Sequence, residues 1–512
     1  MASRCAGHAP DPAPFEFSTL HIMISKPTNV LFILSDEHTR DVTGCYGHPF
    51  IKTPHLDRLA ARGTRFDAAY TNCPICVPAR ASLHTGTYVA DNRCWDNAHP
   101  YDGSMRSWAH RLREAGHHTI SIGKLHFRSD KDDNGFVQEL IPLHVVDGLG
   151  DLLGLVRAPE PAARGGTADL AGSAGPGEST YAHYDRNIRD AAMHWLTHFA
   201  GKLDSPWCLF VSFVKPHFPL VAPQRFYDMY PPDSIPMPRL YGSEHAPTHP
   251  VIAALKRCMN YDDSFTPEKV KIALAAYYGM VSFLDDNIGQ VLDALQRSGL
   301  SNNTRVIYST DHGDNLGNRK LWGKSVHYEE SAAVPMIIAG PGIPEGVSSP
   351  TPVTLVDVYP TIVQSMGLSL DTAEQALPGK SLVDLAWQHD PERVAFGEYH
   401  AAGSITAMYM VRKGRWKYIH HVDYRPELFD LQDDPGETRD LAGDGQYAQT
   451  LAMMEAQLRK IIDPQAVNAQ AFADQKAKIE RYGGVEALIK RGDFGYSPAP
   501  GQKPVFATTL EA

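Results

Sequence analysis

The stretch Cys73-Pro-Ile-Cys76-Val-Pro78-Ala-Arg80, continued by Ala-Ser-Leu-His-Thr-Gly86, is the segment around which the chain is organised. Pro78 suits the first position of a helix, where a missing N–H costs nothing. Gly86 suits the end, because glycine readily takes the left-handed conformation. We therefore predict a short helix that begins just after Cys76 and ends at Gly86. Cys76 would then lie among free N–H groups and beside the guanidinium of Arg80, where an anion can be held.

Outside this segment, polar residues follow four apolar runs that predict buried strands, typical of a parallel sheet. The runs are residues 29–35, 119–122, 207–214 and 305–310. They are followed by Asp36, by Lys124 and His126, by Lys215 and His217, and by Asp311 and His312. Because ligands gather outside the carboxyl ends of the strands in open α/β sheets, we expect these side chains to form one site with Cys76.

The residue types at these strand ends indicate a metal and an anionic ester. The carboxylates of Asp36 and Asp311 suit a hard divalent cation, and an added imidazole shifts the preference towards a transition metal. Two further groups would complete such a site: cations to cradle an ester anion (Arg80, Lys124 and Lys324) and imidazoles to orient or protonate a leaving group (His126 and His217). The sequence thus predicts one metal-assisted site rather than scattered polar residues.

The composition limits the class of protein. The chain has 512 residues, 43% of them hydrophobic and 21% charged, as in ordinary soluble globular proteins. A net charge of −11 argues against nucleic-acid partners and against a basic membrane-binding surface. Seven scattered cysteines are no disulfide framework and fit a reducing compartment. No run approaches a membrane span, and residues 1–26 make a poor secretory signal, so a cytoplasmic location is expected.

The pattern along the chain predicts an α/β protein in four parts. Residues 1–26 are expected to be a disordered extension, and residues 27–400 a large catalytic domain with a mostly parallel sheet between helices. Its clearest helix starts at the N-cap Thr266, whereas the Gly-, Ala- and Pro-rich residues 158–177 are expected to be an excursion. Residues 401–463 are predicted to form a small antiparallel-sheet domain, and residues 464–512 a tail with subunit contacts.

Cys76-Val-Pro-Ala-Arg80, with Leu83, Thr85 and Gly86, resembles the signature of the type I sulfatases, in which the cysteine is oxidised after translation to formylglycine. The strand ending in Asp36, the run Gly123-Lys-Leu-His126, Pro216-His217 and Asp311-His-Gly-Asp314 with Lys324 match that family in type, order and spacing. The resemblance covers about residues 29–441. It implies an alkaline-phosphatase-like α/β fold with a large domain and a smaller C-terminal domain.

The resemblance also implies a mechanism, its cofactors and its partners. The hydrated aldehyde at residue 76 would attack sulfur, release the alcohol through a covalent sulfo-enzyme intermediate, and then expel inorganic sulfate. The ligands carried over for one divalent ion, Ca²⁺ or Mn²⁺, are Asp36, residue 76, Asp311 and His312. The residues carried over for sulfate binding or leaving-group assistance are Arg80, Asn97, Lys124, His126, His217 and Lys324. The implied partners are a small-molecule sulfate ester and a formylglycine-generating enzyme, with a homo-oligomer, dimer or tetramer, as the expected assembly.

Several features are similar to the choline-sulfatase and phosphonate-monoester-hydrolase branch. Asp311-His312 stands where many sulfatases carry Asp-Asn. Asp96-Asn97, residues 398–400 and residues 468–475 also resemble that branch, in which the last segment takes part in subunit contacts. Glu37 replaces the glutamine or aspartate common there and is not assigned as a metal ligand. No aromatic cage for a quaternary ammonium is evident, so choline sulfate is not the expected first substrate.

Other functions stay open at this point. A phosphonate monoester or phosphate diester hydrolase could use the same formylglycine, because both esters present a tetrahedral anionic centre. Cys73-Pro-Ile-Cys76 could instead be a redox or zinc-binding C-x-x-C, but it has no partner pair at suitable spacing and leaves Pro78-Ala-Arg80 unexplained. A chain in which Cys76 is never converted would be a non-catalytic binding protein.

Overall fold

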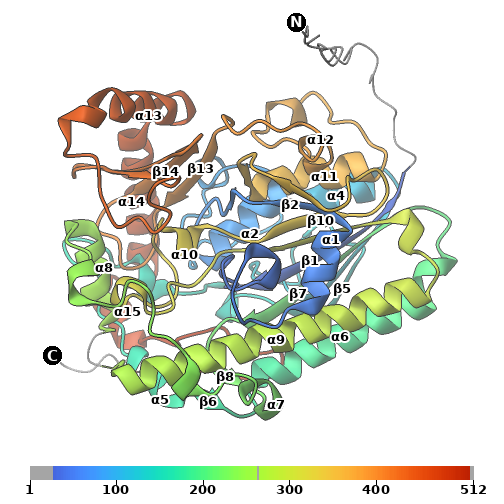
Figure 1. Cartoon of the computed structure of the whole chain (residues 1–512), viewed down its shortest axis with the longest axis horizontal. Helices are drawn as coiled ribbons and strands as arrows, with labels where there is room; N and C mark the ends of the chain where they lie inside the picture. The colour runs from blue at the N-terminus through green and yellow to red at the C-terminus, as the bar shows by residue number, and fades with distance from the viewer. Residues whose placement is uncertain (1–26, 262–263, 508–512) are drawn as a thin grey trace, which may run out of the picture.

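The computed structural model describes residues 27–261 and 264–507, so the predictions made for residues 1–26 and 508–512 lie outside the described residues. A sheet of eight strands forms the centre of the large domain (Figure 1). Its order is β11 (Val347–Ser349), β2 (Gly63–Phe66), β10 (Met336–Ala339), β9 (Thr304–Thr310), β1 (Asn29–Asp36), β7 (Trp207–Pro216), β4 (His118–Lys124) and β5 (Gln138–Leu143).

Most strands of this sheet are parallel. β9, β1, β7, β4 and β5 all run in one direction, whereas β10 runs antiparallel to both of its neighbours. The predicted runs 29–35, 119–122, 207–214 and 305–310 all fall within strands of this parallel group. The α/β fold class predicted from them is therefore confirmed.

Helices cover both faces of the sheet, which is why β1 and β7 are buried along their whole length. Leu31 and Ile33 of β1 pack on one side, with α1 (Pro54–Ala61), α6 (Thr180–His198) and α9 (Pro267–Arg297). Phe32 and Leu34 pack on the other, with α2 (Cys76–Thr85), α4 (Trp108–Glu114) and α11 (Val358–Ser365). Alternate side chains of β1 thus enter two separate hydrophobic cores. Because both faces of the strand are buried, its sequence is an unbroken run of apolar residues.

Two predictions on local structure have clear outcomes. The N-cap of α9 is Thr266, whose hydroxyl accepts a hydrogen bond from the backbone N–H of Lys269, as predicted. The excursion predicted for residues 158–177 contains α5 (Thr167–Ser173) and β6 (Gly175–Pro176), and β6 pairs with β8 (Val221–Ala222). The remaining short strands and α-helices are β3 (Ala69–Tyr70), α3 (Val89–Asn92), α7 (Gln224–Tyr227), α8 (Pro250–Met259), α10 (Glu329–Ala332), β12 (Val353–Thr354) and α12 (Leu382–Leu385).

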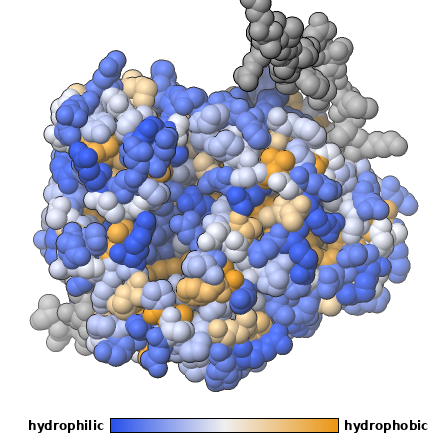
Figure 2. Space-filling model, viewed as in Figure 1, coloured by the Kyte–Doolittle hydropathy of each residue, from blue (hydrophilic) through white to orange (hydrophobic). Residues whose placement is uncertain are grey.

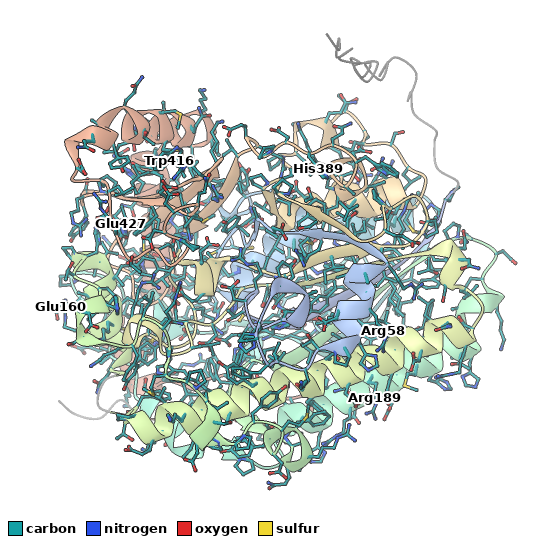
Figure 3. All side chains as sticks on the ribbon, in the orientation of Figure 1. Arg58, Glu160, Arg189, His389, Trp416 and Glu427 are labelled. Carbon is teal, nitrogen blue, oxygen red and sulfur yellow. The ribbon has the colours of Figure 1, made fainter. Side chains whose placement is uncertain are left out.

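A second, antiparallel sheet forms the C-terminal part. It consists of β13 (Ala395–Tyr399), β14 (Met408–Lys413), β15 (Trp416–His421) and β16 (Glu427–Asp430), followed by α13 (Ala448–Ile461), α14 (Pro464–Arg481) and α15 (Val485–Arg491). Figure 3 shows Trp416 and Glu427 on this part, and Arg58 and Arg189 on the helical layer of the large domain. The predicted antiparallel sheet is confirmed. Its first strand lies before residue 401, and the domain boundary set there stays a prediction.

Buried charges join the small sheet to the large domain. The ammonium of Lys417 on β15 lies 2.9 Å from a carboxylate oxygen of Glu329 and 2.7 Å from one of Glu437. Arg40, which follows β1, contacts the other oxygen of Glu329 at 3.1 Å. Because a buried charge without a partner is costly, these contacts hold the two sheets in one relative position.

One face of the molecule is shown in Figure 2. Hydrophilic residues cover most of it, and hydrophobic residues form small groups. Across the described ranges, every helix is too short or too polar to cross a bilayer.

Candidate active site

Two acids meet at the carboxyl end of the sheet because β1 and β9 are neighbours in parallel register. Ser35 of β1 lies opposite Thr310 of β9, so Asp36 and Asp311 follow at the same level. His312 is next in the chain, and all three side chains are fully buried. The structure therefore brings together strand ends that are more than 270 residues apart in sequence.

The segment around Cys76 forms a helix that differs in one detail from the prediction. α2 begins at Cys76 itself, with Ile75 as its extended N-cap, so Pro78 is the third helical residue and not the first. Pro78 is tolerated there because the first N–H groups of a helix have no acceptor within it. Gly86 ends the helix with a φ of 70°, as predicted. The side chain of Cys76 therefore lies directly at the helix N-terminus.

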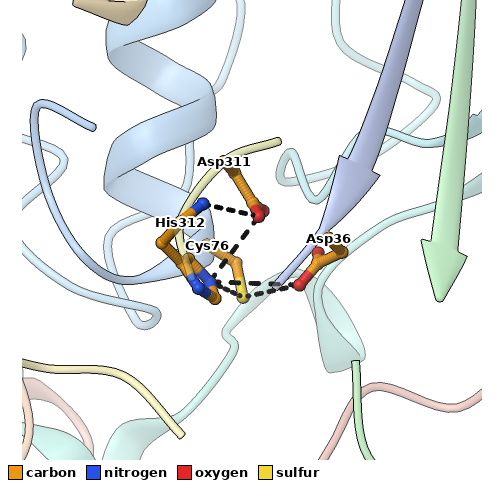
Figure 4. A group of neighbouring side chains, drawn as sticks. All are labelled: Asp36, Cys76, Asp311 and His312. Carbon is orange, nitrogen blue, oxygen red and sulfur yellow. Dashed lines mark hydrogen bonds and ion pairs between the residues drawn. The ribbon is translucent and has the colours of Figure 1, made fainter. Parts of the chain in front are cut away.

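Cys76, Asp36, Asp311 and His312 form one buried group of possible metal ligands. One donor atom from each lies within 4.8 Å of those of the others (Figure 4). The sulfur of Cys76 is 3.2 Å from Nε2 of His312 and 3.7 Å from Oδ1 of Asp36. The same His312 nitrogen is 3.7 Å from Oδ1 of Asp311. Two carboxylates, an imidazole and the side chain of residue 76 on one small volume suit a divalent cation.

Arg80 holds the outer oxygens of both acids. Its Nη2 donates to Oδ2 of Asp36 at 3.0 Å, and its Nε donates to Oδ2 of Asp311 at 2.8 Å. Its Nη1 donates to the backbone oxygen of Lys124 and to the hydroxyl of Ser212, a residue that the sequence did not single out. These contacts leave Oδ1 of each carboxylate facing the group around Cys76. In this geometry Arg80 holds the two acids in place.

Electrostatics keep Asp36 ionised although it is buried. Burial raises the pKa of this carboxyl, but the charges of Lys124 and Arg80 outweigh burial and hold the pKa well below its usual range. The ammonium of Lys124, at the end of β4, lies 2.6 Å from Oδ2 of Asp36. Asp36, a candidate metal ligand, thus holds the side chain of Lys124 in position.

Lys324, His217 and Glu37 form a second set of contacts at the same place. The ammonium of Lys324 lies 2.9 Å from Nε2 of His217 and 3.1 Å from Oε2 of Glu37. Glu37 has a φ of 69°, and burial raises its pKa to about 8. Its Oε1 has no hydrogen-bond partner in the part of the chain that the structure describes. Glu37 lies outside the group formed by Asp36, Cys76, Asp311 and His312. With Asp36 and His217 it forms a further buried set of possible metal ligands.

His126 and Asn97 complete the predicted set. His126 has a φ of 61°, and its Nε2 lies 2.9 Å from the hydroxyl of Ser497, near the end of the described chain. The amide oxygen of Asn97 accepts a hydrogen bond from the backbone N–H of Val77 at 3.1 Å, in the first turn of α2. Asn97 therefore lies against the helix start that carries Cys76.

A cavity of about 860 Å³ opens onto these residues. Its walls include six predicted site residues, namely Cys76, Asn97, Lys124, His126, His217 and Lys324. They also include five aromatic residues that sequence reasoning missed, namely Tyr181, Phe218, Tyr261, Phe494 and Tyr496. These rings come from four distant segments, so no local pattern could have grouped them. The cavity is far larger than a sulfate group and leaves room for a bulky alcohol.

The geometry speaks against the C-x-x-C alternative. Cys73 and Cys76 are both free thiols, and Cys73 belongs to none of the possible metal-ligand groups found among the described residues. Burial raises the pKa of the Cys76 thiol to about 11, the opposite of the lowered pKa that activates redox cysteines. An unmodified Cys76 would be a neutral thiol at physiological pH.

Comparisons with known proteins agree on one family. A family model described as Sulfatase matches residues 28–368, and another, described as N-sulphoglucosamine sulphohydrolase, C-terminal, matches residues 317–464. Choline-sulfatase of Rhizobium meliloti (strain 1021) is 33% identical over 430 residues, which cover 82% of this chain and 83% of that protein. Arylsulfatase K of Danio rerio is 29% identical over 494 residues, 90% of each chain. The phosphonate monoester hydrolase of Agrobacterium radiobacter superimposes with a TM-score of 0.69 at 25% identity, over 87% of this chain and 96% of that one.

Proposed function

This chain belongs to the sulfatase family and is a sulfuric ester hydrolase, and from this premise we propose that it hydrolyses sulfate monoesters with formylglycine, formed from Cys76, as the nucleophile. The observation that carries the proposal is the position of Cys76. Its side chain lies at a helix start, next to Asp36 and His312, and on the wall of the large cavity. A residue placed there meets a substrate and a cation at once.

The donor set supports one divalent cation, Ca²⁺ or Mn²⁺, held by Asp36, Asp311, His312 and residue 76. The two carboxylates fit both ions, and the imidazole favours Mn²⁺. When bound, the cation supplies Lewis-acid polarisation of the ester, and the hydrated aldehyde of residue 76 supplies a hydroxyl nucleophile.

The chain's own cations would stabilise the ester anion. Lys124 and Lys324 line the cavity, and each is held by a buried acidic side chain, Asp36 or Glu37. Charges that are already fixed in place lose little energy to reorganisation during the reaction. Asn97 and His126 line the same wall and would donate further hydrogen bonds to the anion.

The leaving alcohol needs a proton when its bond to sulfur breaks. Lys324 and His217 share one hydrogen bond on the cavity wall, so a proton lies between their two nitrogens. We assign this pair as the general acid. General acid catalysis of this kind contributes about 10²- to 10⁴-fold to a rate.

The decisive experiment combines the mass of residue 76 with activity. The peptide that contains residue 76, from protein made together with a formylglycine-generating enzyme, should have the mass of the aldehyde form. The same preparation should hydrolyse 4-nitrophenyl sulfate and lose activity on chelation of divalent cations. Cys76→Ser should lose turnover, because serine lacks the second hydroxyl that releases sulfate. An unmodified thiol in every preparation, with full activity in Cys76→Ser, would overturn the proposal.

A phosphonate monoester hydrolase is the second candidate, favoured by the superposition on such an enzyme. The ratio of kcat/KM for 4-nitrophenyl sulfate to that for an aryl phosphonate monoester separates the two activities. Choline sulfate belongs in the same assay because of the 33% identity to a choline-sulfatase. A ratio below one would make the phosphonate ester the preferred substrate.

We further propose a formylglycine-generating enzyme as a partner, a dimer or tetramer as the assembly and the cytoplasm as the location. The free thiols of Cys45, Cys73, Cys76, Cys94, Cys208 and Cys258 support a reducing compartment. Light scattering of the purified protein tests the assembly, and fractionation of cells that produce it tests the location.

A further inference from the structure

Residues 493–507 fold back over the cavity and form one of its walls. Backbone hydrogen bonds in both directions between Asp493 and Ala507, at 3.0 and 2.7 Å, close this segment into a loop. Asp493 also forms an ion pair with Arg164, another residue that lines the cavity, at 3.3 Å. The loop is therefore anchored at its ends, with residues 494–505 against the cavity.

Ser497 is the buried residue of this loop that reaches the site. Its hydroxyl lies 2.9 Å from Nε2 of His126. Its backbone oxygen accepts a hydrogen bond from the hydroxyl of Tyr181 on α6. The second contact holds the backbone of the loop independently of the serine side chain.

The other ring nitrogen of His126 has no hydrogen-bond partner within residues 27–261 and 264–507. This atom, Nδ1, is buried, whereas Nε2 is occupied by Ser497. His126 lies on the cavity wall, so Nδ1 is the atom left for a ligand. An oxygen of a sulfate ester can only accept, so it requires a proton on Nδ1.

We propose that Ser497 is a positioning residue: its hydroxyl donates to Nε2 of His126 and thereby keeps the proton of the neutral imidazole on Nδ1, where it binds a sulfate oxygen. This inference rests on the proposed function for the identity of the anion. The surroundings favour a neutral ring, because burial and the charges of Lys124 and Arg80 lower the pKa of His126 well below its usual range. A neutral ring has a single N–H, so the direction of the Ser497 bond decides which nitrogen carries it.

The test compares Ser497→Ala, Ser497→Thr and Pro500→Ala. Pro500 lies in the same loop but is exposed and is not among the residues that line the cavity, so it is the matched control. Each metal-loaded protein is titrated with inorganic sulfate in a calorimeter and assayed with 4-nitrophenyl sulfate. We expect Ser497→Ala to weaken sulfate binding and to lower kcat/KM about 10- to 100-fold. Ser497→Thr, which keeps the hydroxyl, should restore most of both.

The outcomes separate this inference from the proposed function. Equal sulfate affinity and kcat/KM in wild type and Ser497→Ala would overturn the role of Ser497, whatever Cys76→Ser does. A loss as large in Ser497→Thr or Pro500→Ala would also overturn it, because the loop and not the hydroxyl would then be responsible. Sulfate affinity does not depend on turnover, so it decides the role of Ser497 even if 4-nitrophenyl sulfate is not a substrate. Absence of sulfate binding by the wild type would contradict the inference as well.

Discussion

The ammonium of Lys324 donates a hydrogen bond to Nε2 of His217, with 2.9 Å between the two nitrogens. An imidazole nitrogen that accepts carries no proton, so the proton of His217 is on Nδ1, which donates to the backbone oxygen of Phe218 at 2.7 Å. Burial and the charge of Lys324 both lower the pKa of His217 well below its usual range. The wall of the cavity thus presents a neutral imidazole held by a cation.

Lys324 and His217 should act as one unit. Lys324→Met and His217→Asn are each expected to lower kcat by about 100-fold or more, because each breaks the shared hydrogen bond. The double variant should be little slower than the slower single variant, since the interaction is lost only once. The values of kcat for the wild type, the two single variants and the double variant give the coupling energy between Lys324 and His217. Single effects that simply multiply in the double variant would show that the two residues act independently.

Arg80→Lys should weaken metal binding. A lysine cannot reach the outer oxygens of both Asp36 and Asp311, which the guanidinium holds through two different nitrogens. We expect the affinity for Ca²⁺ or Mn²⁺ to fall about 10- to 100-fold. This affinity is measured as the metal content of each protein after dialysis against solutions with a fixed concentration of free metal ion. Arg113→Lys, at an exposed ion pair with Asp133, is the matched control, and equal metal content in both variants would refute the role given to Arg80.

Tyr496→Ala should change substrate preference. The Tyr496 ring packs edge-on against Tyr181 at 5.2 Å and against Phe218 at 6.2 Å between ring centroids, and all three line the cavity. An aryl sulfate should lose about tenfold in kcat/KM and a short alkyl sulfate about twofold or less, because only the aryl group contacts the ring. Assays with both esters give the ratio. Phe199→Ala, which removes an exposed ring, should leave it unchanged; equal losses for both esters in Tyr496→Ala would contradict the prediction.

Stability should depend on pH through Glu329. Burial raises its pKa, but Lys417 and Arg40 outweigh burial and lower the pKa to about 2. A carboxyl with a lowered folded-state pKa stabilises the protein above its unfolded-state pKa, near 4.5, and this stabilisation is lost as the pH falls towards 2. Glu329→Gln imitates the protonated form, so it should cost about 3 kcal/mol at neutral pH and progressively less in acid.

Urea unfolding of wild type and Glu329→Gln, from neutral pH down to about pH 3, measures that difference. Glu345→Gln, at an exposed carboxylate, is the control and should show no such trend. A difference between Glu329→Gln and wild type that stays constant across the acid range would contradict the ion-pair explanation.

Local patterns predicted what depends on neighbours in the chain. Thr266 was expected as an N-cap and is one, because its hydroxyl bonds to a backbone group three residues away. Gly86 ends α2, as predicted, because a helix end of this kind needs one residue with a positive φ and glycine adopts that conformation readily. Pro78 was misplaced by two residues, because a proline fits any of the first helical positions and cannot distinguish among them.

Contacts between distant segments were beyond such reasoning. Ser497 bonds to His126 across 371 residues, and the Gln475 amide of α14 donates to Asp96 across 379. Neither residue carries a local signal, because a serine or glutamine in a tail is ordinary surface composition. The tail was predicted to make subunit contacts, and that stays a prediction beside the contacts it makes within its own chain.

The sequence by itself determined the parallel sheet, the acids and cations that follow its strands, and the helix at Cys76. It could do so because buried strands and helix ends are written in short runs of residue types. Only the tertiary structure decided that Arg80 holds the outer oxygens of both acids, that Lys324 donates to His217, and that residues 493–507 wall the cavity. Those relationships depend on strand order and on how a distant loop packs, which no local pattern encodes.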